Sequence, residues 1–144
     1  MPLPDDAVEA RAQGWRTLAA LHARIEDRLE KALQKEHGLS VSEYTVLDVL
    51  GRQDGWHMRM QQLSRAVVLS QSATTRLVTR LENRDLLRRY LCEDDRRGIY
   101  SEVTPEGRAL LAQAGPTHDA VLKEVLAEAA ELPELAPLAA VIAP

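Results

Sequence analysis

The chain has 144 residues, 45% hydrophobic and 28% charged, which suits one folded domain with a sizeable core and excludes the disordered class. No apolar run approaches the length of a membrane span, and the first residues lack the basic start and apolar stretch of a signal peptide. The net charge of −4 argues against indiscriminate binding of polyanions, and the single cysteine, Cys92, excludes an internal disulfide and fits a reducing cytoplasm.

The N-terminal part predicts a long helix over residues 7–36. Bulky residues recur there at spacings of three and four, the pattern of a helix packed along one side, at Trp15, Leu18, His22, Ile25 and Leu29. Gly38 is suited to end this helix in a left-handed turn. Ser40 and Glu43 then form a capping box, which predicts a second helix through Leu50.

The middle of the chain predicts a winged helix-turn-helix, two helices followed by a β-hairpin. Ser70 is the expected N-cap of the second of these helices. In chain order the elements are a short strand at 57–60, helices at 61–68 and 71–84, and strands at 87–92 and 99–104, which flank a charged loop at 93–98.

The C-terminal part predicts more helix. Thr104 is an expected N-cap with Pro105 at the first helical position, and the helix runs to about Glu131. Pro116 is expected to bend it, because the proline ring removes a backbone hydrogen bond. Pro133 ends it, and a short last helix follows.

Positive charge is concentrated around the helix predicted at 71–84. Residues 59–108 hold ten arginines, no lysine and seven acids, a net charge of +3, whereas the rest of the chain has a net charge of −7. Arginine suits phosphate and guanine because its planar guanidinium donates two parallel hydrogen bonds. The segment therefore predicts a nucleic-acid-binding surface on an otherwise acidic protein.

One face of the helix at 71–84 carries the residues expected to contact DNA. Ala73, Leu77 and Leu81 fall on its inward side, and the opposite stripe has hydroxyl and arginine side chains without an acid. A solvated polar face is the ordinary alternative, but the neighbouring arginines favour a recognition helix in the major groove, with an arginine of the wing in the minor groove. The expected DNA-binding residues are Ser70, Gln71, Ser72, Thr74, Thr75, Arg76, Thr79, Arg80, Arg96 and Arg97, with Asp95 supporting Arg97 and with Arg88 and Arg89 along the DNA backbone.

Four short motifs stand out in the winged region: LSQSATTRLVTRL at 69–81, LLRR at 86–89, DRR at 95–97 and VTPEG at 103–107. In this order they resemble the MarR family of bacterial transcription regulators, and the similarity covers nearly the whole chain. Two residues depart from the family's pattern. Asp85 stands where the family usually has glycine, and Val68 replaces a small turn residue, so we expect the turn at Asp85 to be strained or differently shaped.

The resemblance implies a mainly α fold with a small β-hairpin, in which a winged helix-turn-helix domain is joined to a helical dimerisation region from both termini. The predicted domains are an N-terminal dimerisation helix at 1–38, the DNA-binding domain at 39–104 and C-terminal dimerisation helices at 105–144. Apolar positions beyond what the winged core can bury also favour a homodimer, and their burial within the same chain is the alternative. These positions are Leu3, Val121, Leu122, Val125, Leu126, Leu135, Leu138 and Ile142.

The family resemblance also implies a small phenolic or other anionic effector, bound between the helical region and the winged domain. The candidate pocket residues are Trp15, His22, Trp56 and Arg59, although Trp15 and His22 lie on the apolar stripe, where a place in the core is the alternative. No cofactor or metal is expected, because the four histidines lack metal-ligand spacing, and no catalytic motif is present.

The sequence therefore predicts a cytoplasmic, homodimeric, DNA-binding transcription regulator that is neither an enzyme nor membrane-bound. We expect a ligand-responsive repressor that binds a pseudo-palindromic double-stranded DNA operator through the helix at 71–84 and the wing at 93–98. The alternative is a winged-helix protein-interaction module without sequence-specific DNA binding, and salt-dependent binding to duplex DNA separates the two.

Overall fold

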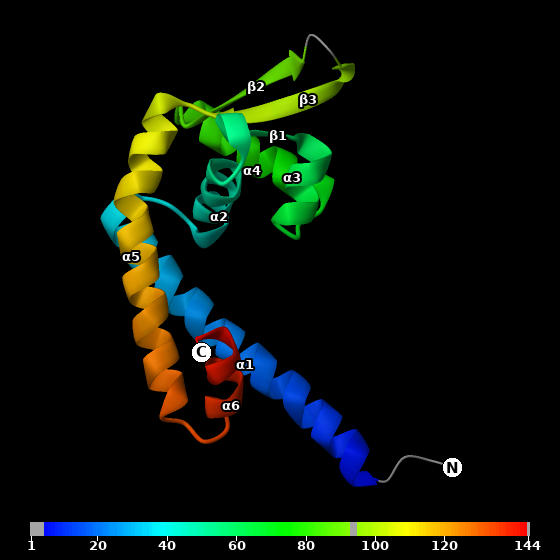
Figure 1. Ribbon diagram of the computed structural model, residues 1–144, viewed down its shortest axis with the longest axis vertical. Helices are drawn as coiled ribbons and strands as arrows, with labels where there is room; N and C mark the ends of the chain where they lie inside the picture. The colour runs from blue at the N-terminus through cyan, green and yellow to red at the C-terminus, as the bar shows by residue number, and fades with distance from the viewer. Residues whose placement is uncertain (1–4, 93–94, 144) are drawn as a thin grey trace. The chain divides into compact units, whose positions relative to one another are not determined.

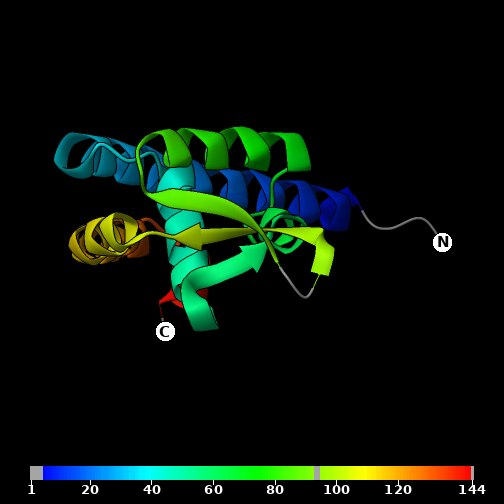
Figure 2. The same cartoon turned by 90° about the horizontal axis from the view of Figure 1, so that it is seen from above.

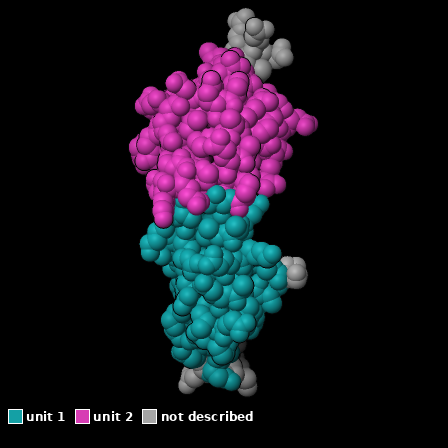
Figure 3. All heavy atoms as spheres, turned by 90° about the vertical axis from the view of Figure 1, so that its left-hand side faces the viewer, with its two compact units in different colours: residues 1–32, 117–144 teal, residues 33–116 magenta. Residues whose placement is uncertain are grey.

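The computed structural model describes residues 5–92 and 95–143, apart from the side chains of residues 5, 92 and 95–97. The chain divides into two compact units, coloured separately in Figure 3. Unit 1 comprises Met1–Ala32 and Thr117–Pro144, and unit 2 comprises Leu33–Pro116. Two long helices, α1 and α5, contribute residues to both units.

The fold is mainly helical with a three-stranded antiparallel sheet, as labelled in Figure 1. In chain order the elements are α1 (Asp5–His37), α2 (Val41–Gly51), the 3-10 turn η1 (Asp54–Trp56), β1 (His57–Arg59), α3 (Met60–Ala66), α4 (Gln71–Asn83), β2 (Leu87–Cys92), β3 (Asp95–Val103), α5 (Pro105–Ala130) and α6 (Ala136–Ile142). The mainly α class with a small wing sheet is confirmed.

The helix starts predicted from the sequence have the expected caps. At α2 the Ser40 hydroxyl accepts from the Glu43 backbone N–H at 3.0 Å, and the Ser40 N–H donates to the Glu43 carboxylate at 2.8 Å. At α5 the Thr104 hydroxyl accepts from the Gly107 N–H at 3.0 Å, directly before Pro105. These caps satisfy backbone N–H groups that the helices leave without partners, which fixes where the helices begin.

Unit 2 has a closed apolar core. Helices α2, α3 and α4 contact one another, and α4 also contacts β2. The fully buried side chains include Leu33, Leu39, Val46, Leu47, Leu50, Leu63, Val78 and Leu81. This core holds α4 in place from its apolar side.

The wing sheet has the order β1–β3–β2, with β2 and β3 side by side in Figures 1 and 2. The short strand predicted at 57–60 is confirmed as β1, paired with β3 through His57 opposite Glu102. The second strand of the hairpin was predicted at 99–104 but begins at Asp95. The pairing of β2 with β3 continues past a register shift after Leu91, so that Cys92 lies opposite Asp95. The expected loop at 93–98 is therefore shorter, and residues 93–94 lie outside the described part of the chain.

Both departures from the family pattern lie in left-handed turns. Val68, between α3 and α4, has φ 58°, and Asp85, after α4, has φ 61°. Aspartate tolerates this region better than a β-branched residue, for which it is a strained conformation. The Asp85 turn is also held from outside, because the Thr104 hydroxyl donates to the Asp85 carbonyl at 2.7 Å. Both turns have the left-handed backbone, and the strain is larger at Val68 than at Asp85, where it was expected.

Unit 1 has a small core formed by α1, α5 and α6. Its buried residues are Leu21, Leu126, Ala129, Leu135 and Ala139. Val125, Leu126 and Leu135, expected to require a partner surface, are buried within the same chain, so the alternative of intramolecular burial holds for these three. Ile142 stays exposed.

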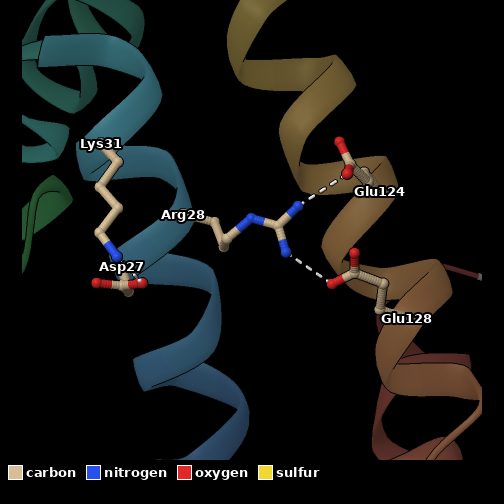
Figure 4. Close-up of polar contacts among 5 residues, drawn as sticks. All are labelled: Asp27, Arg28, Lys31, Glu124 and Glu128. Carbon is tan, nitrogen blue, oxygen red and sulfur yellow. Dashed lines mark hydrogen bonds and ion pairs between the residues drawn. The ribbon is translucent and has the colours of Figure 1, made fainter. Parts of the chain in front are cut away.

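Within unit 1, Arg28 of α1 forms ion pairs with α5. As Figure 4 shows, its guanidinium donates to Glu128 at 2.7 Å and to Glu124 at 2.8 Å. The hydrogen bond that Arg28 donates to Glu128 is the largest cause, and together the two carboxylates raise the pKa of Arg28 above its usual value. The ion pairs are solvent-exposed and therefore orient the helices more than they stabilise them.

The N-terminal half of α1 is exposed. Trp15, placed on an apolar stripe by its spacing, is 68% exposed, and the His22 side chain is also exposed and lies 3.7 Å from Glu26. A place in the core, the alternative for these two residues, is therefore wrong for the single chain, because the buried part of the stripe begins only at Leu21.

Within residues 5–92 and 95–143, none of the helices combines the length and apolarity that a bilayer crossing requires.

Candidate DNA-binding surface

Helix α4 presents its polar face to solvent and its apolar face to the core of unit 2. Ser70 caps it, with its hydroxyl accepting from the Ala73 N–H at 3.1 Å. Leu77 and Leu81 are buried as predicted, with Val78 between them, and Ala73 is half-buried. The sequence pattern therefore oriented the helix correctly.

Most of the residues expected to contact DNA lie on the outer face. Gln71, Ser72, Thr75, Arg76 and Arg80 are exposed, as is Ser70, and Thr79 is half-buried.

The burial of Thr74 differs from its prediction as a DNA-binding residue. It was expected among the DNA-binding residues, but it is 0% exposed and its hydroxyl donates to the Ser70 carbonyl at 2.9 Å. It lies one position before Thr75, and that rotation of about 100° around the helix carries its side chain into the core. Thr74 supports α4 from within and is not part of the outer stripe.

A groove of about 640 Å³ runs along α4. Residues from three segments line it: Ser42, Leu69, Ala73, Thr75, Arg76, Leu77, Thr79 and Arg80. Ser42 was not predicted, because its place beside α4 depends on how α2 packs. It lies in the first turn of α2. The groove thus combines two arginines with hydroxyl groups.

The threonine hydroxyls of the stripe are bonded back to their own helix. Thr75 donates to the Gln71 carbonyl and Thr79 to the Thr75 carbonyl, both at 2.8 Å. Their protons are therefore used within the helix, and the Thr79 oxygen also accepts from Arg89 Nη2 at 3.2 Å. A threonine methyl group suits contact with the thymine methyl, whereas arginine suits guanine.

The arginines of the basic segment fall into two groups. Arg84, for example, donates to the Gly38 carbonyl at 2.9 Å and pairs with Glu43 at 3.3 Å, which ties α4 to the end of α1 within unit 2. Arg76 and Arg80, by contrast, form no ion pair or hydrogen bond through their side chains with any residue that the structure describes. Some arginines of the basic segment are thus engaged within the fold, whereas Arg76 and Arg80 are exposed on the outer face of α4.

Arg88 and Arg89, expected along the DNA backbone, are both engaged within unit 2. They are neighbours on β2 and point to opposite faces of the sheet. Arg88 pairs with Glu102 of β3, and Arg89 pairs with Glu82 of α4 at 2.7 Å. Their contact with the DNA backbone stays a prediction.

The outer face of the sheet carries a ladder of aromatic rings. Tyr90 and Tyr100 stack with centroids 5.7 Å apart, and His57 Nδ1 lies 2.5 Å from the Tyr90 hydroxyl. Guanidinium groups lie 5.8 Å from each tyrosine ring, Arg88 at Tyr90 and Arg59 at Tyr100. Cross-strand pairs of this kind stiffen a sheet. The ladder therefore supports the wing from the side facing away from α4.

The candidate effector residues are divided between the two units. Trp15 and His22 belong to unit 1, and Trp56 and Arg59 belong to unit 2. Arg59 donates to the Tyr100 hydroxyl at 3.1 Å, and the Arg108 guanidinium lies 4.5 Å from the Trp56 ring. The shared pocket of these four residues stays a prediction.

The side chains of Asp95, Arg96 and Arg97, expected at the wing, lie outside the described part of the structure. Their roles also stay predictions. Among the residues whose positions are given, no group of three His, Cys, Asp or Glu side chains could hold a metal ion.

Comparison with known proteins identifies the class of regulator. A model of the MarR family matches residues 37–98. The HTH-type transcriptional regulator MhqR of Bacillus subtilis (strain 168) is 30% identical over 114 residues, which are 79% of this chain and 77% of that protein.

Two solved structures extend the similarity. AbsC, a MarR family transcriptional regulator from Streptomyces coelicolor, is 31% identical with a TM-score of 0.78 over 100% of this chain and 94% of AbsC. CouR from Rhodococcus jostii RHA1, whose structure holds p-coumaroyl-CoA, is 31% identical with a TM-score of 0.67 over 72% of this chain and 71% of CouR.

Proposed function

This chain belongs to the MarR family of transcription regulators, and from that premise we propose that it is a homodimeric repressor of a pseudo-palindromic operator that a small effector releases. One observation supports DNA reading most directly. Arg76 and Arg80 line a groove on an exposed helix face, and no described side chain pairs with them. Such arginines suit bidentate contacts with guanine in the major groove.

Charge and exposed apolar surface support the proposed dimer. The basic segment has a net charge of only +3 in one copy, which suits weak binding to a polyanion. Exposed Val8, Trp15, Leu18 and Val141 in unit 1 offer a surface for a second copy. Two copies related by a two-fold axis would double the phosphate contacts and read a two-fold symmetric site.

Selection from a random duplex library, followed by binding measurements, tests this function. The selected sequences should be two-fold symmetric, and affinity should fall steeply with salt. Arg76→Ala and Arg80→Ala should each weaken binding by about tenfold or more, as expected for loss of a base-contacting arginine. Lys31→Ala removes one charge from an exposed pair with Asp27 in unit 1 and is the control.

The results separate regulator from interaction module. No enriched duplex and no salt-dependent DNA binding would contradict the proposal and favour the protein-interaction alternative. Repression is tested with the selected sequence placed over a reporter promoter, where co-expression of the protein should lower transcription. A rise in transcription would instead make the protein an activator.

The effector proposal rests on the family and on the ligand in CouR. Two tryptophans, Trp15 and Trp56, serve as reporters. Phenolic acids and their coenzyme A thioesters are titrated against tryptophan fluorescence and against binding of the selected duplex. A shared midpoint in both titrations supports an effector, and no response in either contradicts it.

A further inference from the structure

Arg89 joins the wing to the recognition helix. From β2 it contacts two residues on successive turns of α4. Its Nε atom forms an ion pair with Glu82 Oε1 at 2.7 Å, without the alignment of a hydrogen bond, and its Nη2 atom donates to the Thr79 hydroxyl at 3.2 Å. A single guanidinium therefore holds α4 at two points, which a planar group with several fixed donors does better than a lysine.

Burial distinguishes this contact from a surface ion pair. Glu82 Oε1 is shielded from solvent, and the side chains are 25% exposed for Glu82 and 33% for Arg89. If Arg89 turned outward to a phosphate, it would leave a shielded carboxylate oxygen without its cation, which is unfavourable. Its geometry therefore favours a fixed contact over a mobile one.

The contact reaches the DNA-facing groove through Thr79. Thr79 lines the groove, donates to the Thr75 carbonyl and accepts from Arg89. A change in the rotation or translation of α4 would move Arg76 and Arg80, which lie on the same helix. Reading of bases needs side chains held within a fraction of an ångström, and supporting contacts provide this.

From these contacts we infer that Arg89 is a positioning residue: it sets the orientation of α4 against the wing, and thereby sequence specificity, without contacting DNA. The inference rests on the proposed function, since α4 must read DNA for its orientation to matter. The competing role is a phosphate contact made directly by Arg89.

Arg88 provides the matched control. It is the neighbouring residue on β2, points to the opposite sheet face, is 68% exposed and pairs with Glu102. Arg88→Gln and Arg89→Gln remove the same charge from adjacent positions. Arg89→Gln removes contacts with α4, whereas Arg88→Gln removes contacts within the wing sheet.

The experiment measures affinity for the selected duplex and for a scrambled duplex of equal length, over a range of salt. Arg89→Gln should lower the ratio of the two affinities by about tenfold, the scale of one mismatched base pair. The slope of log affinity against log salt on the scrambled duplex should match that of Arg88→Gln. A slope reduced by about one more than in Arg88→Gln, with an unchanged ratio, would assign Arg89 to a phosphate and overturn the inference.

Glu82→Gln tests the same inference from the acidic partner of the ion pair. A positioning role predicts that this variant also lowers the ratio, and that the double variant Arg89→Gln with Glu82→Gln is no worse than Arg89→Gln alone. A phosphate role predicts tighter binding to both duplexes, because Arg89 is released and an acid is removed.

Two measurements keep these outcomes interpretable. Circular dichroism and thermal unfolding show whether each variant is folded at the assay temperature, and Arg89→Lys, which keeps the charge but not the two-point contact, should lose specificity with its salt slope intact. If Arg89→Lys keeps the wild-type ratio, the two-point contact is not what sets specificity and the inference fails. If the unmodified protein selects no duplex, the proposed function itself fails.

Discussion

The two units bury their apolar residues to different extents. In unit 2 the leucines of α2, α3 and α4 are fully buried by the same chain, including Leu47, Leu50, Leu63 and Leu81. In unit 1 the buried cluster is small, and a row of large apolar side chains is exposed, among them Trp15 at 68%. Unit 2 therefore has a closed core of its own, although Val68 and Leu91 are exposed at its surface, whereas the exposed apolar side chains of unit 1 accompany only a small buried cluster.

A core substitution in unit 2 should have the largest effect. Leu47→Ala should lower the free energy of unfolding by about 2–5 kcal/mol, because a fully buried side chain leaves a cavity. Urea unfolding followed by circular dichroism measures this. Leu91→Ala, at a position 63% exposed on β2, is the control and should change stability little. Equal losses in the two variants would show that the core of unit 2 is not closed as described.

The next effect concerns association through unit 1. Trp15→Ala should weaken the proposed homodimer by about 2 kcal/mol, the scale of an interface hot spot, and shift sedimentation toward monomer at low concentration. The helical content at high concentration should stay unchanged, because Trp15 buries little surface in its own chain. An unchanged dimer would remove Trp15 from the interface. Leu91→Ala again serves as the exposed apolar control.

A smaller effect, with the opposite sign, is expected at a turn of unit 2. Val68→Gly should stabilise the protein by about 1 kcal/mol, since φ of 58° strains a β-branched residue and suits glycine. Asp85→Gly, at φ 61°, should gain less, because aspartate tolerates this region. Chemical unfolding of both variants provides the comparison. A loss of stability in Val68→Gly would mean that the turn is held by more than its backbone preference.

The smallest effect is expected for the exposed ion pairs of unit 1. Arg28→Ala removes contacts to Glu124 and Glu128, which solvent screens, so the melting temperature should change less than in Val68→Gly. The difference from wild type should shrink further as salt is raised. A large, salt-independent loss would instead indicate that these pairs hold unit 1 together in place of its small core.

Local features were read correctly from the sequence. Ser40, Ser70 and Thr104 were identified as caps because capping depends on hydrogen bonds over three residues, which a short segment determines by itself. The buried side of α4 followed from helical periodicity. The same local motifs indicated the MarR family and the winged fold.

Other features required the tertiary structure. Thr74 and Thr75 are adjacent and chemically equal, and only the packing of α4 against unit 2 decides which one faces solvent. Arg88 and Arg89 are adjacent and chemically equal, yet Arg88 pairs with Glu102 of β3 and Arg89 pairs with Glu82 of α4, because neighbouring residues of a strand point to opposite faces of the sheet.

The sequence by itself thus determined which elements form and which family they belong to, because hydrogen bonds and apolar periodicity act over a few residues. The tertiary structure decided which arginines are engaged within the fold and which ones face outward. That division depends on contacts between segments far apart in the chain, such as Arg84 with Gly38 and Glu43, which no local pattern specifies. Ser42 lines the groove along α4 for the same reason, since its place depends on how α2 packs against α4.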